Sequence, residues 1–164
     1  MNPGATLLIA EDDENDLFFL QRAFESANVK NPLSIARDGQ EAIDYLSGTG
    51  DYADRIKFPF PYLFLLDLKM PRKTGMEVLE WLCEQPELHC LPVVVFSSSA
   101  NRKDIERAYE LGANAFVVKP SSMAKRAELA KAMALFWLES NSPPMICTDG
   151  LEAARKIRAE RGCS

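Results

Sequence analysis

Apolar residues gather along this chain in five short runs, and each run is followed by a stretch with helical spacing. The runs are ATLLIA (5–10), LSIA (33–36), YLFLLD (62–67), PVVVFS (92–97) and AFVVK (115–119). Runs that are apolar at successive positions indicate strands that are buried on both faces. Apolar residues three and four positions apart indicate helices that lay one face on a core. The pattern therefore predicts strands and helices in alternation.

Start and stop signals support the helices between these runs. Leu17 and Leu20 begin an apolar stripe after the first run, and Asp38 with Glu41 resembles a capping box after the second. Gly112 is a natural stop for the helix that follows the fourth run. The last predicted helix is rich in alanine and ends near residue 138.

Five strand–helix units predict an α/β fold, an open doubly wound sheet of five parallel strands in the flavodoxin-like order 2-1-3-4-5. A closed eight-stranded barrel needs about 250 residues, and this chain has 164. We expect residues 1–142 to form one domain. Prolines at 143 and 144 break the last helix, so residues 143–164 are predicted to be a tail, either a short helix or disordered.

Composition narrows the classes of function. The chain is 47% hydrophobic with a net charge of −5, as in a soluble globular domain, and this acidity argues against a nucleic-acid partner. No apolar run approaches the roughly 20 residues that span a bilayer, so no membrane contact is expected. The first residues lack a secretion signal, which makes the cytoplasm the default location. The four cysteines and the one histidine lack the spacing of a zinc site.

Polar residues stand at the carboxyl ends of four predicted strands. Glu11 and Asp12 follow the first strand, Asp67 closes the third, Ser97 the fourth and Lys119 the fifth. Open α/β sheets bind ligands at this edge, beside the point where the strand order reverses. In the order 2-1-3-4-5 the first and third strands are neighbours, so we expect Asp12 and Asp67 to converge.

Converging carboxylates repel one another, so they either share a proton or hold a cation. A few hard oxygen ligands at the rim of a wet cleft suit Mg²⁺. The Ser97 hydroxyl and the Lys119 ammonium would complement the anionic oxygens of a phosphoryl group. Asp67 is then interpreted as a nucleophile that accepts this group. The alternative is a structural α/β domain in which these residues only cap helices and form turns.

Over residues 5 to about 139 the chain resembles the receiver domain of two-component response regulators. The resemblance is carried by Glu11-Asp12, LLDLKMPRKTG around Asp67, VVVFSSS with Ser97, and GANAFVVKP with Lys119. It implies that a sensor histidine kinase phosphorylates Asp67, and that the protein assists its own phosphorylation and dephosphorylation without being a conventional enzyme.

The resemblance also assigns individual roles. Mg²⁺ would be held by Glu11, Asp12, Asp67 and the backbone carbonyl of Lys69. Ser97 and Phe116 would form a switch pair, and the bond between Lys119 and Pro120 would be cis.

The segments GTGDYADR, PRKTG and FWLES are similar to those of small stand-alone regulators that pair with bacteriophytochromes and related sensor kinases. This similarity implies a homodimer through the face formed by the fourth helix, the fifth strand and the fifth helix. Output would then be a protein–protein contact.

Three rival functions fit part of this pattern. A phosphatase of the haloacid-dehalogenase type needs an aspartate two residues after its nucleophile, and Lys69 stands there. An FMN carrier needs a phosphate-binding loop after the first strand, where this chain has EDDEND. An atypical receiver that binds partners without phosphorylation stays open, and metal-dependent phosphorylation distinguishes it.

Overall fold

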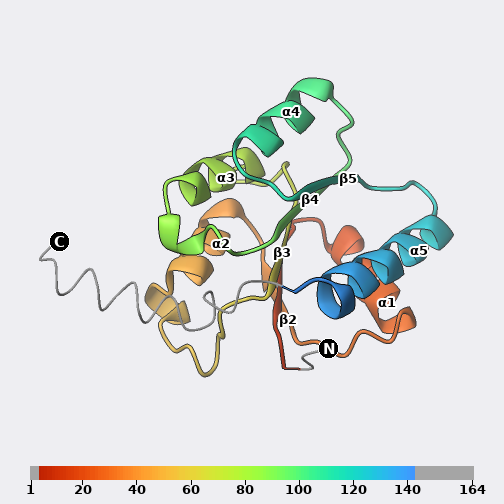
Figure 1. Ribbon diagram of the computed structural model, residues 1–164, viewed down its shortest axis with the longest axis horizontal. Helices are drawn as coiled ribbons and strands as arrows, with labels where there is room; N and C mark the ends of the chain where they lie inside the picture. The colour runs from red at the N-terminus through yellow and green to blue at the C-terminus, as the bar shows by residue number, and fades with distance from the viewer. Residues whose placement is uncertain (1–3, 143–164) are drawn as a thin grey trace, which may run out of the picture.

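The computed structural model describes residues 4–142, in which strands and helices alternate along the chain (Figure 1). The strands are β1 (Leu7–Ala10), β2 (Leu33–Ala36), β3 (Leu63–Leu66), β4 (Val93–Ser97) and β5 (Ala115–Val118). The helices are α1 (Glu14–Ser26), α2 (Gly39–Ser47), α3 (Gly75–Cys83), α4 (Arg102–Glu110) and α5 (Met123–Met133). Every strand lies within one of the five apolar runs of the sequence.

The five strands form one parallel sheet in the order β2-β1-β3-β4-β5, which confirms the predicted fold class. Ala10 of β1 lies beside Leu66 of β3, so the residues that follow these two strands emerge next to each other. Val95 of β4 pairs in the same way with Phe116 of β5. The order reverses between β1 and β3, which places the predicted site at that point.

Helices cover both faces of the sheet, α1 and α5 side by side on one face and α2, α3 and α4 on the other (Figure 1). The side chains of successive strand residues point to opposite faces of the sheet, where they pack into two hydrophobic cores. Leu8 and Phe64 belong to the core under α2 and α3. Leu7 and Leu65 belong to the core under α1 and α5. Burial on both faces explains why the inner strands β1, β3 and β4 are apolar at successive positions, whereas the outer strands β2 and β5 are only partly buried.

The capping box that the sequence predicts at α2 is only partly formed, whereas the box at α3 is complete. Thr74 and Glu77 form a complete capping box at α3. Asp38 caps α2 by accepting the N–H of Glu41, but the Glu41 carboxylate accepts the N–H of Arg37 and not that of Asp38. The predicted box at α2 is therefore only half formed, since the chain turns so that the preceding amide reaches the carboxylate.

The long connection between α2 and β3 is ordered around aromatic rings. The rings of Tyr45, Tyr52 and Phe58 contact one another with centroids 4.9–6.1 Å apart. Arg55 donates hydrogen bonds to the carbonyls of Tyr45 and Leu46 at 2.7 and 2.8 Å. A cation thus satisfies acceptors in the last turn of α2, where the helix dipole favours positive charge.

The last helix changes from α-helical to π-helical geometry before it ends. α5 is α-helical to Met133 and continues as a π-helix over Ala134–Ser140, so the helical rod extends slightly past the predicted end. Trp137 packs against the core under α1 and α5, whereas Phe136 is 55% exposed. The predicted tail, residues 143–164, lies outside the described residues. Among residues 4–142, each helix is too short or too polar to cross a membrane.

Candidate functional site

Backbone hydrogen bonds between neighbouring strands hold the predicted site residues at one edge of the sheet. The N–H of Asp67 donates to the carbonyl of Ala10 at 3.0 Å, and that of Glu11 donates to Ala36 at 3.0 Å. On the other side, the N–H of Lys119 donates to the carbonyl of Ser97 at 2.8 Å. Backbone hydrogen bonding between the strands therefore continues one residue past the ends of β1, β3 and β5. It fixes the backbone positions of the polar residues that follow these strands.

Three carboxylates converge at this edge, as the sequence predicted for Asp12 and Asp67. Glu11, Asp12 and Asp67 each offer an oxygen, and these oxygens lie within 4.8 Å of one another. Glu11 and Asp67 are buried, while Asp12 is exposed. A buried pair with one open neighbour is a donor set of hard oxygens that suits a divalent cation with several waters retained.

Lys119 lies within this carboxylate group. Its ammonium donates hydrogen bonds to Glu11, to Asp16 at 2.8 Å and to Asp67 at 3.1 Å. The Lys119 side chain is only 3% exposed, so the ion pairs with Glu11 and Asp67 are buried. All three donors of the ammonium are used.

Burial and charge shift the pKa values of these groups in different ways. Burial raises the pKa of Glu11 to about 7, against the opposing hydrogen bond and charge of Lys119. Burial would lower the pKa of Lys119, but its bonds to Asp16 and Glu11 and the charge of Asp67 outweigh burial and raise it. The ammonium therefore stays charged in a site that favours additional positive charge.

The loop after β3 is held close to the acidic cluster. The N–H of Lys69 donates to Asp67 Oδ1 at 3.3 Å, and the Lys69 side chain is exposed. The N–H of Gly75 donates to the carbonyl of Leu68 at 2.9 Å. A Cβ at Gly75 would lie 2.1 Å from the Asp67 carbonyl oxygen, so only glycine permits this close return of the chain.

Ser97 and Phe116 lie on the adjacent strands β4 and β5. The Ser97 side chain is fully buried, and its hydroxyl accepts the N–H of Ser99 at 3.2 Å. Phe116 is half-buried against the core under α3, and its N–H donates to the Tyr109 hydroxyl at 3.1 Å.

The predicted cis bond between Lys119 and Pro120 is wrong, because residues 4–142 contain no cis peptide bond. The trans form of an X–Pro bond is favoured by about 0.5–1 kcal/mol. Arg126 Nε donates to the Pro120 carbonyl at 2.6 Å, a contact that anchors this trans loop to α5.

Sequence reasoning missed Asp16 and Arg126. Asp16 Oδ2 binds Lys119, and Asp16 Oδ1 accepts a hydrogen bond from Arg126 at 3.1 Å. Burial would raise the pKa of Asp16, but Lys119 and Arg126 together lower it. One signal was available: Asp16 lies in the first turn of the helix whose N-cap directly follows Asp12, so its side chain stays near this edge of the sheet. Arg126, 110 residues away, gave no such signal.

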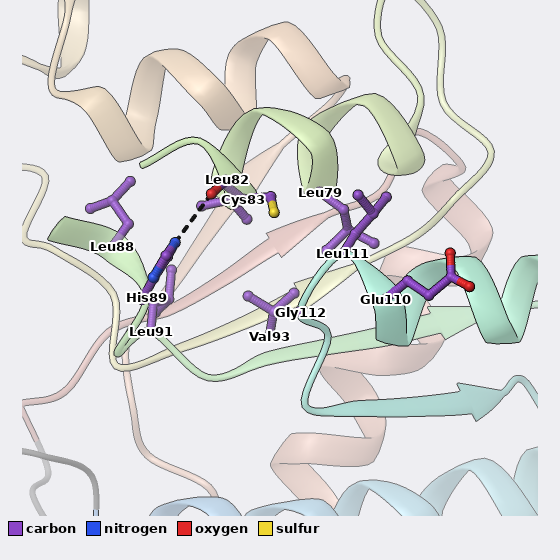
Figure 2. A pocket seen from close by; sticks show the side chains of 10 residues that line it. All are labelled: Leu79, Leu82, Cys83, Leu88, His89, Leu91, Val93, Glu110, Leu111 and Gly112. Carbon is purple, nitrogen blue, oxygen red and sulfur yellow. Dashed lines mark hydrogen bonds between the residues drawn. The ribbon is translucent and has the colours of Figure 1, made fainter. Parts of the chain in front are cut away.

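A separate cavity of about 300 Å³ lies at the other end of β4, between α3 and α4 (Figure 2). Its walls are mostly leucine side chains, which come from α3, from the connection between α3 and β4 and from the C-terminal end of α4. His89 lies at its rim, and the ring bonds to the Cys83 carbonyl at 3.2 Å. His89 is exposed in a turn, and the acidic cluster lies at the opposite end of the strands.

The acidic edge thus combines a buried carboxylate, a buried ammonium and a candidate cation site. These groups suit an anionic substrate that reacts with a carboxylate and carries several oxygens, which describes a phosphoryl group.

The sequence matches a family of known proteins over most of its length. Residues 7–133 match the family described as the response regulator receiver domain. Over 143 residues the chain is 34% identical to response regulator Rcp1 of Synechocystis sp., and the match covers 87% of this chain and 95% of that protein.

Solved structures resemble the chain over most of its length. The phosphorylated cyanobacterial phytochrome response regulator RcpA has a TM-score of 0.80 at 34% identity, covering 86% of this chain and 99% of that one. The Mn²⁺-bound form of Rcp1 has a TM-score of 0.78 at 33% identity, with coverages of 85% and 99%. The bacteriophytochrome response regulator AtBRR has a TM-score of 0.65 at 40% identity, with coverages of 79% and 93%.

Proposed function

Since this chain belongs to the response regulator receiver domain family, we propose that Asp67 is the residue that accepts its phosphoryl group. Phosphorylation of an aspartate by a sensor histidine kinase is the general function of that family. The observation that carries the assignment is the buried pairing of Asp67 with Lys119 at 3.1 Å, at the reversal point of the sheet. A buried carboxylate that accepts a hydrogen bond from a fixed ammonium is held in one orientation for attack on phosphorus.

The proposed transfer is a displacement at phosphorus. A carboxylate oxygen of Asp67 bonds to phosphorus while the bond from phosphorus to the phosphohistidine nitrogen of the kinase breaks. The imidazole leaves with the bonding electron pair. Water later attacks the phosphorus of the acyl phosphate, which releases inorganic phosphate and restores the Asp67 carboxylate.

Two side chains would stabilise the transferred group. Lys119 supplies a fixed ammonium that can donate to a phosphoryl oxygen, and Ser97 supplies a hydroxyl from the end of β4. As Ser97 turns toward the phosphoryl oxygen, Phe116 would rotate into the space it leaves. This exchange would be a two-state change driven by a charge-assisted hydrogen bond.

A divalent cation fits the acidic cluster. Glu11, Asp12 and Asp67 would hold it together with the backbone carbonyl of Lys69, and Mg²⁺ is the proposed ion. When bound, the ion neutralises charge on the incoming phosphoryl oxygens. The Mn²⁺-bound relative Rcp1 supports a divalent metal as the class of ligand.

We propose a phytochrome-type sensor histidine kinase as the partner, in the cytoplasm. Support comes from the similar phytochrome and bacteriophytochrome response regulators.

Output is proposed to run through a homodimer formed by α4, β5 and α5, with no contact to nucleic acid or membrane. Tyr109, Val118 and Met123, one from each of these elements, are 42–50% exposed. Large apolar side chains left open on neighbouring elements favour a protein contact.

The test is to incubate the protein with Mg²⁺ and acetyl phosphate and to record its intact mass. Asp67→Asn removes the proposed acceptor with little change in shape. Asp51→Asn, at an exposed aspartate in the short helical turn Gly50–Tyr52 after α2, is the matched control. We expect one phosphoryl group on the wild type and on Asp51→Asn, and none on Asp67→Asn.

An adduct on Asp67→Asn would show that another residue accepts the group. A wild type that gains no mass with Mg²⁺ and donor present would contradict the assignment and favour a phosphorylation-independent binding module.

A further inference from the structure

Asp16 is a carboxylate that the proposed reaction does not use. It belongs to the first turn of α1 and lies outside the Glu11, Asp12 and Asp67 cluster that fits a cation. Yet its Oδ2 atom accepts one of the three hydrogen bonds of the Lys119 ammonium, at 2.8 Å. Its Oδ1 atom accepts a hydrogen bond from Arg126 at 3.1 Å. Asp16 therefore bridges the site lysine and α5.

Arg126 is itself held by three contacts. Besides Asp16 it donates through Nε to the Pro120 carbonyl at 2.6 Å, and its guanidinium lies 5.7 Å from the centre of the Phe19 ring. Its side chain is 19% exposed, and that of Asp16 is 28% exposed. A planar guanidinium with several fixed donors orients a carboxylate better than a flexible ammonium does. Arg126 thus fixes where Asp16 presents Oδ2.

The position of Lys119 depends on how its three carboxylate partners share it. A phosphoryl oxygen can bind the ammonium only if one of the three existing hydrogen bonds is released, because the ammonium has three donors. A cation would compete for Glu11 and Asp67, the other two partners. Asp16 lies outside that cluster, so its hydrogen bond to Lys119 is the one of the three for which a cation would not compete.

We propose that Asp16, fixed by Arg126, is a positioning residue that sets the place of the Lys119 ammonium for phosphoryl transfer. This inference rests on the proposed function of Asp67. Asp16 contacts neither the phosphoryl group nor the metal in this scheme, and acts only through Lys119. The pair also joins the site to α5 by a path that does not include Ser97 and Phe116.

The first measurement is the rate at which acetyl phosphate modifies Asp67 in the presence of Mg²⁺. Removing a group that orients a reacting side chain typically costs about 10- to 100-fold in activity. We expect Asp16→Asn to slow modification about tenfold, and Arg126→Gln to slow it less, in the same direction. Glu14→Gln removes a charge from the same turn of α1, where Glu14 pairs with the surface residue Arg37, and should leave the rate unchanged.

Two further readouts distinguish positioning from a general structural effect. In a Lys119→Gln background, Asp16→Asn should cause no additional loss, because the group on which it acts is gone. In protein labelled with ¹⁵N at lysine Nζ, the Lys119 ammonium signal should shift in Asp16→Asn and stay in place in Glu14→Gln. Mg²⁺ affinity measured by calorimetry should be unchanged in Asp16→Asn.

The outcomes separate the two proposals. If the wild type is not phosphorylated, the assignment of Asp67 fails first. If the wild type is phosphorylated and Asp16→Asn matches its rate, only the positioning role is overturned. An equal loss in the presence and absence of Lys119 would also overturn it, since Asp16 would then act by some other route.

Discussion

Arg72 shows how a single residue in the loop after β3 is held in an unusual conformation. Its φ is 60°, in the left-handed region that a side chain with a Cβ rarely adopts. Its guanidinium donates two hydrogen bonds to Asp38 at 2.8 and 3.0 Å, and Asp38 also caps α2. The two-pronged ion pair ties this loop to the start of α2 and offsets the cost of the backbone conformation.

The pairing makes stability depend on pH. Burial would raise the pKa of Asp38, but the bonds from Arg72 and from the α2 backbone outweigh it and lower the pKa. A lowered folded-state pKa contributes stability that is full above the unfolded value of about 3.9 and is lost as pH falls through the folded value. We expect Asp38→Asn to cost about 1 kcal/mol at pH 7, because asparagine keeps the cap but not the charge.

Urea unfolding followed from pH 7 into the acid range measures this effect. The gap between wild type and Asp38→Asn should close as pH falls, whereas Asp51→Asn should follow the wild type throughout. A gap that persisted unchanged at low pH would mean that the Asp38 charge is not its source.

Residue types at strand ends were predictable because each lies next to an apolar run in the sequence. The convergence of Asp12 and Asp67 followed from the strand ends and the sheet order, whereas Glu11 was added to the ligand set through the family resemblance. The Asp16–Arg126 pair did not, because it depends on how α1 packs beside α5, and no local pattern encodes that contact.

At the scale of elements, the return of the chain from β3 to α3 depends on Gly75. A Cβ there would lie 2.1 Å from the Asp67 carbonyl oxygen and 2.7 Å from Leu68 Cα, both of them backbone atoms that cannot yield cheaply. We expect Gly75→Ala to lower the free energy of unfolding by about 3 kcal/mol. It should also weaken metal binding, because the loop carries Lys69.

Gly50→Ala is the matched control for this substitution. Nothing lies within 4 Å of a Cβ at Gly50, and its φ of 58° alone should cost about 1–2 kcal/mol. Thermal or urea unfolding of both variants gives the comparison. Equal losses would show that the contact with β3 is not what requires glycine at position 75.

Element types followed from the periodicity of the sequence, and strand boundaries agreed to within one or two residues. The ordered connection between α2 and β3 could not be foreseen, because it depends on Arg55 reaching the end of α2 and on rings that meet only in the fold. The π-helix after Met133 also lacked a signal, since its apolar residues fit an α-helical stripe equally well.

At the scale of the whole molecule, metal binding should raise the melting temperature. A ligand at about a hundredfold excess over its Kd stabilises the folded state by about 2.7 kcal/mol, which raises Tm by roughly 5–10 °C for a domain of this size. We expect Mg²⁺ to raise the Tm of the wild type. Asp12→Asn should gain much less, because it removes the exposed member of the proposed ligand set without disturbing the core.

Without metal the same substitution should have the opposite sign. Asp12 places a further carboxylate beside those of Glu11 and Asp67, so replacing it with a neutral amide relieves repulsion and should raise Tm slightly. Calorimetric scans with Mg²⁺ and with a chelator test both signs, and Asp51→Asn should follow the wild type in each. An equal response of Asp12→Asn to Mg²⁺ would place the ion elsewhere.

The hydrogen bond between Tyr109 and Phe116 affects whether the outer strand β5 can pair with another chain. β5 is an outer strand, and open outer strands recruit foreign strands and promote aggregation. The Tyr109 hydroxyl, carried by α4, occupies the backbone N–H of Phe116 at 3.1 Å. Tyr109 thus protects the outer strand from pairing at this position, a role that lysine or proline has in other proteins. A protein that binds over α4 and β5 would contact side chains, and it could add a strand at Phe116 only by displacing the Tyr109 hydroxyl.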